Sequence, residues 1–462
     1  MRFISILGVT IACALVTACV GPNYKRPTFD ATAAYKEQDG WKPSEPSDAL
    51  DRGNWWEIFH DEVLNSLEAQ LNISNENLKA TAAAVEESRA LLRQAQAQYW
   101  PSVGVSAQRQ RTVQGTGKPR TLNSFDITGT WDVDLWGRIR RTTESSRASL
   151  QASEADLASA RLAAQAELAT DYFELRVQDQ LQIILNDIVA AEQQSLKITE
   201  NRYRVGVAAK ADVVTAQTQL LTSQAEQVNA PQQRAILEHA IAVLVGQQPA
   251  SFSLPTAAMR ADVPTVPAGL PSALLERRPD VAGAERRVAA ANAQIGVAIS
   301  AFFPTLTLTG SDDYQGTTIS HLIGTANRVW AIGPTIALSV FDAGLRRAQV
   351  AAARATYEQT VDIYRQTVLT SLQQVEDDIV TLRVLEQRAV IEDATVKAAR
   401  EAEALTLNQY KAGTVPYSSV ILTQTTRLNS EQNALNVLSG RLQASVALIQ
   451  SLGGGWKASE LK

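Results

Sequence analysis

Catalytic or metal-binding chemistry would require histidine, cysteine or acidic side chains at defined spacings, and the sequence offers no such arrangement. Its three histidines, His60, His239 and His321, lie far apart, and none has a partner at the spacing of a metal site. A glycine-rich phosphate-binding loop and a Gly-x-Ser-x-Gly nucleophile motif are also missing from the sequence. We therefore expect no catalytic residue, no metal site, no cofactor and no enzyme activity.

Cys19 is the residue with the clearest chemical assignment. It follows a positively charged start, an apolar stretch and the small residues 16–18, an arrangement that resembles the lipobox of bacterial lipoproteins. The resemblance implies that residues 1–18 are a signal peptide and that Cys19 carries acyl chains such as palmitate. Val20 stands where an aspartate would retain such a lipoprotein at the inner membrane, so we expect the outer membrane. An ordinary secretory signal that happens to contain a cysteine is the alternative.

Three aspartates could serve a water-filled passage instead of a reaction. Asp126, Asp132 and Asp134 alternate with apolar residues over 125–135, and successive side chains of a strand point to opposite faces. A soluble sheet would turn the apolar face inward to a core, whereas a membrane barrel would turn it outward to lipid, and alternation alone fits both. In a barrel these aspartates would face the lumen and favour cations.

The strands come in two pairs. Residues 101–137 and 302–340 each contain two alternating segments of about ten residues, and Pro334 predicts a bulge or a sheet edge in the last one. The smallest membrane barrels need about eight strands. One chain therefore cannot close a barrel, and four strands per chain form a closed wall only in an oligomer.

Long helices are expected to position these strands. Residues 138–205 and 345–412 are each 68 residues long and free of glycine and proline, so each predicts one helix of roughly 100 Å. Gly206 and Gly413 then allow sharp turns into returning helices, which we expect Pro231 and Gly440 to break.

The chain thus reads as a tandem repeat, mainly α with a small β part. The expected segments are a signal peptide (1–18), an acylated tether (19–60), a first repeat (61–247), a Pro-rich linker (248–271), a second repeat (272–452) and a C-terminal tail (453–462).

The charge of the chain argues against nucleic acid as a partner. Net charge is −5 and the isoelectric point is about 5.5, and no cluster of lysine and arginine is present. Beyond the signal, no apolar run is long enough to cross a bilayer as a helix.

Several motifs at the repeat boundaries resemble one family. Together they are similar to the outer-membrane factor family of TolC-type exit ducts, and more narrowly to its NodT-type lipoprotein branch, which serves resistance-nodulation-division efflux pumps. The motifs are Gly21-Pro22-x-Tyr24-x-Arg26-Pro27, Trp131-Asp132-x-Asp134-Leu135-Trp136-Gly137-Arg138, Arg277-Arg278-Pro279-Asp280, Ala301-Phe302-Phe303-Pro304, Phe341-Asp342-Ala343-Gly344 and Leu452-Gly453-Gly454-Gly455-Trp456.

This resemblance implies a homotrimer in which twelve strands form an outer-membrane β-barrel, continuous with a periplasmic α-helical tunnel. The trimer would be the channel of a tripartite efflux pump that exports small toxic compounds or drugs. Its partners would be a periplasmic adaptor protein, an inner-membrane efflux transporter and outer-membrane lipid. The adaptor would contact the two tip turns, which consist of Val205, Gly206 and Val207 and of Ala412, Gly413 and Thr414.

The resemblance also implies a gate at the tips. Asp212 and Tyr410 match a family aspartate and tyrosine that help to close the tunnel. The sequence departs from the family where relatives place a basic residue and acids after the second tip glycine, because Val415, Ser419 and Leu422 stand there. A mainly apolar constriction at Leu422 is the hypothesis that follows.

Two other functions fit parts of the sequence. A duct for type I secretion of proteins or peptides would share the fold but not the efflux pump. A periplasmic spacer lipoprotein with a coiled coil and no pore would explain the long helices and the anchor alone.

Overall fold

The computed structural model describes residues 20–29, 35–37, 54–259, 263–264, 266 and 277–454. Cys19 and the expected signal peptide lie outside the described residues. Along the chain the elements are η2 (Trp55–Phe59), α2 (Glu62–Ser74), α3 (Glu76–Ala97), β1 (Ser102–Thr112), β2 (Arg120–Val133), α4 (Arg138–Arg204), α5 (Lys210–Leu244), η3 (Pro249–Ser251), α7 (Pro279–Ser300), β3 (Thr305–Gly316), η4 (Thr325–Asn327), β4 (Arg328–Ala337), α8 (Leu345–Ala412) and α9 (Tyr417–Ser451).

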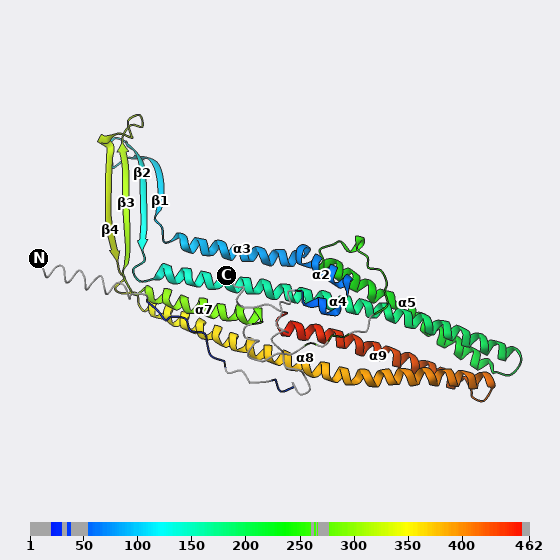
Figure 1. Ribbon diagram of the computed structural model, residues 1–462. Helices are drawn as coiled ribbons and strands as arrows, with labels where there is room; N and C mark the ends of the chain where they lie inside the picture. The colour runs from blue at the N-terminus through cyan, green and yellow to red at the C-terminus, as the bar shows by residue number, and fades with distance from the viewer. Residues whose placement is uncertain are drawn as a thin grey trace.

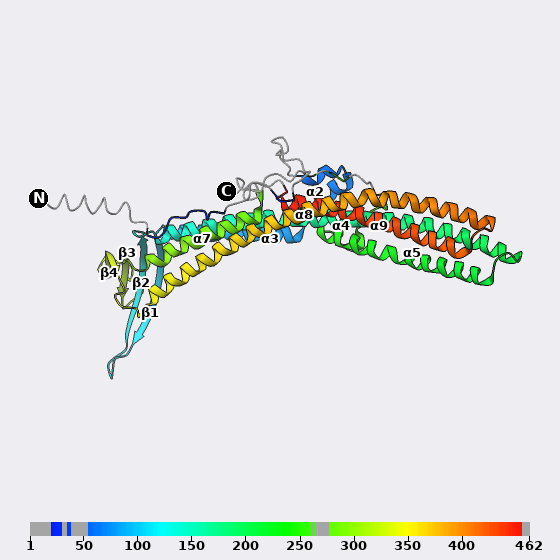
Figure 2. The same cartoon turned by 90° about the horizontal axis from the view of Figure 1, so that it is seen from below.

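The molecule is elongated, with the sheet at one end and two helical tips at the other (Figure 1). Helices α4 and α8 run from the sheet to the tips, while α3 and α7 accompany them on the sheet side and α5 and α9 on the tip side (Figure 2). A glycine in the left-handed conformation precedes each long helix, with φ of 82° at Gly137 and 93° at Gly344. The two predicted long helices are present, and the same order of elements occurs twice.

The returning helices differ from the expectation, because neither is broken. Helix α5 runs through Pro231 and α9 runs through Gly440. An interior proline costs about 3 kcal/mol, but Ala230 beside it is buried in a cluster with Leu185 of α4, and this packing holds the helix together. Gly440 lets α9 approach α8 closely, since a Cβ there would lie 3.3 Å from Leu385 Cδ1. Tertiary packing overrides the local breaker signals at both positions.

The four strands form one antiparallel sheet in the order β1-β2-β3-β4, which leaves β1 and β4 as edges. The edge position of β4 accounts for Pro334, which pairs with Leu308 without a bulge. One face of the sheet is apolar yet uncovered, with Val103 71% and Ile332 79% exposed. An apolar face of this kind needs an apolar phase or a partner to cover it.

The largest buried cluster lies midway along the helices and joins η2, α2, α4, α8 and α9. Trp55 and Trp56 are both buried in it, and the Trp55 indole donates to Gln165 Oε1 at 3.3 Å. The tryptophan pair therefore docks the end of the N-terminal tether onto the helices.

A buried ion cluster next to this core ties the following loop to the helices. Asp179 on α4 is completely buried and accepts from Arg176 Nη1 at 2.9 Å and from Arg234 Nε on α5 at 2.7 Å. The same two arginines donate to the carbonyls of Pro255 and Leu254. Asp179 is thus the carboxylate shared by the two cations that organise the loop after α5, and Glu238 also pairs with Arg234 at 3.4 Å.

Glu68 on α2 predicts that the stability of the folded protein depends on pH. Both of its carboxyl oxygens are buried without a hydrogen-bond partner in the described part of the chain, and burial raises the pKa of Glu68 to about 9. Because the folded chain then binds this proton more tightly than the unfolded chain, stability is expected to fall as pH rises from about 4.5 to about 9.

We expect Glu68→Gln to make the melting temperature nearly independent of pH across that window. At pH 8 the variant should melt at a higher temperature than the wild type, since a neutral amide carries no charge to desolvate. Glu62→Gln, at an exposed position on the same helix, is the matched control and should follow the wild type. An unchanged pH profile in Glu68→Gln would contradict the prediction.

Candidate functional site

The two helical tips are built by matched glycine turns. Gly206 and Gly413 both adopt the left-handed conformation, with φ of 77° and 81°. Val207 N donates to Arg202 O at 2.8 Å, and Thr414 N donates to Gln409 O at 3.0 Å, which closes the last turns of α4 and α8. The remaining predicted tip residues are Val205 and Ala412, of which Val205 is 73% exposed. The tips therefore offer exposed small and apolar side chains at the end of the molecule.

Arg202 joins the two tips, and the sequence analysis did not identify it. Its Nη1 donates to the carbonyls of Tyr410 at 2.6 Å and Lys411 at 3.1 Å, in the last turn of α8. Its guanidinium also lies 4.7 Å from the centre of the Tyr410 ring, and the Tyr410 hydroxyl contacts Thr199 Oγ1 of α4 at 3.2 Å. A cation at the C-terminal end of a helix is favourable, so this contact, which we call the Arg202 latch, fastens α4 to α8.

The structure separates the predicted gate residues. Tyr410 is buried beside Tyr417 and Val420, whereas Leu422 is 69% exposed on α9. Asp212 lies in the first turn of α5, where its carboxylate accepts from Ala209 N at 3.4 Å. Among the described residues, the Tyr410 hydroxyl donates to Thr199 of α4 and forms no hydrogen bond with Asp212. A constriction at Leu422 stays a prediction.

The aspartates of β2 occupy different settings. Asp126 accepts from Ser106 Oγ at 3.0 Å and lies opposite Asp313 of β3, on the polar face of the sheet. Asp132 shares that face and accepts from Thr307 Oγ1 at 2.8 Å. Strand β2 ends at Val133, two residues earlier than expected.

Asp134 therefore lies outside β2, which corrects its assignment to the alternating strand over 125–135. Its carboxylate accepts from Ile139 N at 3.1 Å and Arg140 N at 2.8 Å and so caps the start of α4. The carboxylate satisfies backbone donors at the positive end of the helix.

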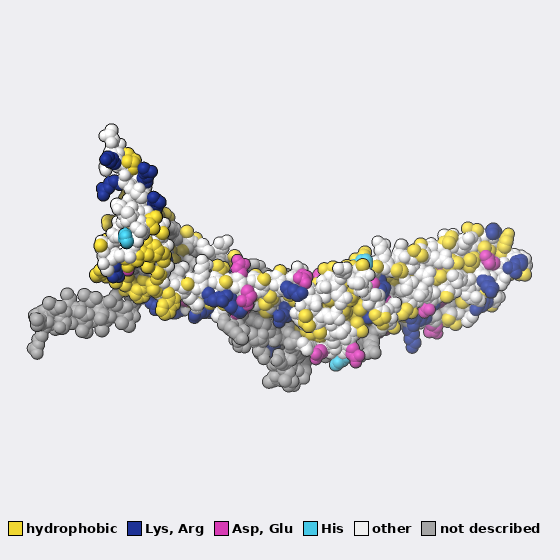
Figure 3. Space-filling view, turned by 90° about the horizontal axis from the view of Figure 1, so that it is seen from above, with side chains coloured by type: hydrophobic (Ala, Val, Ile, Leu, Met, Phe, Trp, Pro, Cys, Tyr) yellow, Lys and Arg dark blue, Asp and Glu magenta, His cyan; other side chains and the backbone are white. Residues whose placement is uncertain are grey.

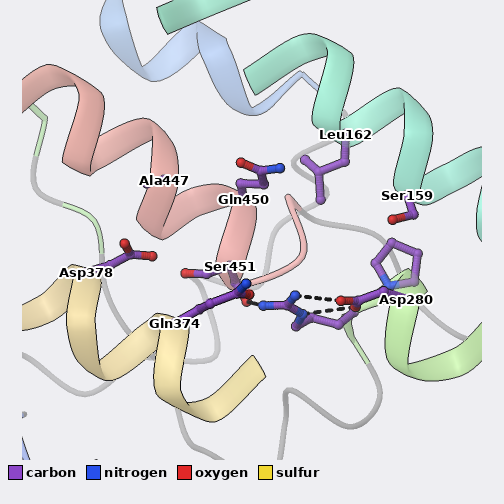
Figure 4. A pocket seen from close by; sticks show the side chains of 10 residues that line it. Ser159, Leu162, Asp280, Gln374, Asp378, Ala447, Gln450 and Ser451 are labelled. Atoms are coloured by element: carbon purple, nitrogen blue, oxygen red, sulfur yellow. Dashed lines mark hydrogen bonds and ion pairs between the residues drawn. The ribbon is translucent and has the colours of Figure 1, made fainter. Parts of the chain in front are cut away.

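A cavity of about 320 Å³ lies where the end of α9 meets the start of α7, between α4 and α8 (Figure 4). Arg278 bridges the two helices, since its Nη2 pairs with Asp280 Oδ2 at 2.6 Å and its Nη1 donates to Ser451 O at 3.1 Å. Burial raises the pKa of Asp378, on the cavity wall, to about 6. The Arg-Arg-Pro-Asp motif therefore begins α7 and joins it to the end of α9.

In the described ranges, no group of three or more histidine, cysteine or acidic side chains is placed to bind a metal ion. Nor does any helix in those ranges combine the length and apolarity that crossing a membrane requires.

Comparison with known proteins identifies the family. The sequence model of the family described as outer membrane efflux protein matches residues 68–247 and 270–454. The chain is 27% identical to the probable efflux pump outer membrane protein TtgC of Pseudomonas putida, over 98% of this chain and 96% of that protein. It is 29% identical to the pyoverdine export outer membrane protein OpmQ of Pseudomonas aeruginosa, over 98% of this chain and 97% of that protein.

The solved structure of the outer-membrane channel OprN is similar in fold. It superposes with a TM-score of 0.86 at 30% identity, and the match covers 95% of this chain and 99% of that one. The expected relationship to TolC-type exit ducts is thereby confirmed, while the narrower NodT-type branch and the acyl anchor stay predictions. The chain belongs to the outer membrane efflux protein family.

Proposed function

We propose that three copies of the chain form an outer-membrane channel that passively conducts small toxic compounds or drugs from a periplasmic pump assembly to the exterior. The observation that carries this proposal is the sheet with two open edges and an exposed apolar face. Family membership and relatives named as efflux pump outer membrane proteins support the same function.

Closure into a barrel would account for the two open edges and the exposed apolar face of the sheet. In a trimer, β1 of one protomer would pair with β4 of the next, so that twelve strands leave no edge. The apolar face, with Val105, Trp330 and Ile332, would then meet lipid, and the face with Asp126 and Asp132 would meet the aqueous lumen. The lumen would favour cations over anions near these carboxylates.

The residues after Cys19 support an anchor at the inner surface of the outer membrane. Val20 N donates to Trp136 O at 3.3 Å, between β2 and α4, and Asn292 Nδ2 donates to Pro22 O at 3.1 Å. Acyl chains on Cys19 would start one residue away, at the level where the strands give way to helices. The anchor would thus enter the inner leaflet beside the periplasmic end of the barrel.

The helical part would form the periplasmic tunnel, narrowed at the tips to a small residual conductance until a partner opens it. A periplasmic adaptor that contacts the exposed turns at Val205–Val207 and Ala412–Thr414 would favour an open state by binding it more tightly. The inner-membrane partner would be an efflux transporter of the resistance-nodulation-division type.

Planar-bilayer recording tests the proposal. The purified protein is expected to insert and produce uniform current steps that favour K⁺ over Cl⁻, and Asp126→Asn with Asp132→Asn should reduce that preference. A protein that never conducts would support the spacer alternative. Conduction combined with failure to restore drug resistance in a strain without its own efflux channel would favour the secretion duct.

A further inference from the structure

One face of the hairpin formed by β1 and β2 changes from apolar to cationic along β1. On β1, Val103 and Val105 share a face with Arg109 and Arg111, because side chains two residues apart point the same way. All four side chains are exposed. If the proposed barrel is correct, this face meets lipid, so the two arginines lie on the lipid side of the wall.

The register places these arginines just beyond the apolar band. Phe125 of β2 lies opposite Ala107 on one side and Tyr314 on the other, and the two aromatic rings are 6.5 Å apart. Arg109 pairs with Asn123, one row further from the helices. Aromatic rows mark the membrane interfaces of barrels, so the next row outward is at the level of lipid headgroups.

The length of the apolar face agrees with this assignment. From Val133, at the helical end of β2, to Phe125 the strand has nine residues, and a tilted membrane strand crosses the hydrocarbon with about 9–11 residues. The apolar band of an outer-membrane barrel is about 25 Å tall. Arg109 and Arg111 consequently fall outside the hydrocarbon, on the side away from the periplasm.

Neither arginine has an ion-pair partner among the described residues. Residues 101–125 contain four cations and no aspartate or glutamate, and β4, the edge that a neighbouring protomer would bring beside β1, contains no acid either. Asp312 is on the same face, but Arg328 already binds it, with Nε 2.7 Å from Oδ1. Lysine and arginine side chains gather at this outer end of the sheet (Figure 3).

We propose that Arg109 and Arg111 bind the phosphate groups of a phosphorylated lipid in the outer leaflet. A guanidinium presents paired donors that match phosphate oxygens, and unpaired cations at the headgroup level attract anionic lipid. This inference rests on the proposed function, because it requires the barrel to stand in the membrane with its apolar face outward. The lipid would fix the height and orientation of the barrel.

The test compares two double variants on the same hairpin that remove equal charge. Arg109→Gln with Arg111→Gln removes the lipid-side cations. Lys118→Gln with Arg120→Gln removes one cation from the turn and one from the strand face that carries Asp126. Each protein in detergent is titrated with bis-phosphorylated lipid A, with dephosphorylated lipid A and inorganic phosphate as the comparison ligands.

The first pair is expected to weaken binding of bis-phosphorylated lipid A about 30-fold, since each of the two cations near an anionic surface contributes about 5-fold. The second pair should change it less than about 3-fold, and the wild type should hold dephosphorylated lipid A only weakly. Equal losses in both pairs, no loss in the first pair, or displacement of the lipid by millimolar phosphate would each overturn the proposal.

Conductance separates this inference from the proposed function. Both double variants should still conduct, because neither pair contacts another described side chain through an ion pair or hydrogen bond. If the wild type conducts but binds lipid A no better than the first pair, the lipid site is wrong and the channel stands. If the wild type fails to conduct, the channel itself is wrong.

Discussion

Asp179→Ala is expected to lower the free energy of unfolding by about 3–5 kcal/mol, because it leaves Arg176 and Arg234 without their shared carboxylate. Arg176 is almost completely buried, so water cannot replace the lost partner. The loop that both arginines hold through the carbonyls of Leu254 and Pro255 should loosen as well. Denaturant unfolding followed by circular dichroism measures the loss, and proteolysis between α5 and α7 reports the loop.

Asp156→Ala is the matched control for this prediction. Asp156 also pairs with an arginine, Arg287, but both side chains are about half exposed. Surface pairs of this kind contribute about 0–1 kcal/mol. Equal effects of the two substitutions would contradict the assignment of Asp179 as the charge that organises the middle of the molecule.

Removal of the Arg202 latch is expected to open the channel. Arg202→Ala deletes two charge-assisted hydrogen bonds to the end of α8 and the contact with the Tyr410 ring. Such bonds contribute about 1.5–3 kcal/mol each, so the closed arrangement loses enough stability in three protomers to shift the equilibrium strongly. Mean conductance in planar bilayers should rise by more than about tenfold.

Arg204→Ala removes the same charge from the same helical turn without touching α8, and it should leave conductance near that of the wild type. The two variants together separate the latch from a general charge effect at the tip. An Arg202→Ala protein that assembles normally and conducts no more than the wild type would show that the latch does not hold the tunnel closed.

The features that the sequence predicts well depend on local signals. Long helices follow from the absence of glycine and proline over 138–205 and 345–412, and strands follow from strict alternation, as in residues 125–133. The turn glycines Gly206 and Gly413 could be located because a left-handed residue favours glycine.

The features that it does not predict depend on contacts between distant segments. Arg202 and Tyr410 are separated by more than 200 residues, and no spacing rule links them. Pro231 reads as a breaker, yet packing of α5 on α4 keeps the helix whole. Asp134 fits the alternation of a strand, but its carboxylate is used at the start of the next helix. Arg109 and Arg111 do not form a recognisable cluster in the sequence because a neutral residue separates them. Only the strand register places both on the side that would face lipid.

The oligomeric state tests the central claim most directly. Light scattering and negative-stain imaging of the detergent-extracted protein would give its mass and symmetry in one preparation. We predict a particle of about three times the chain mass, with three-fold symmetry and a tapered tube of roughly 100 Å below a short barrel. A monomeric or two-fold rod that leaves the membrane once the anchor is removed would contradict the channel and favour a periplasmic spacer.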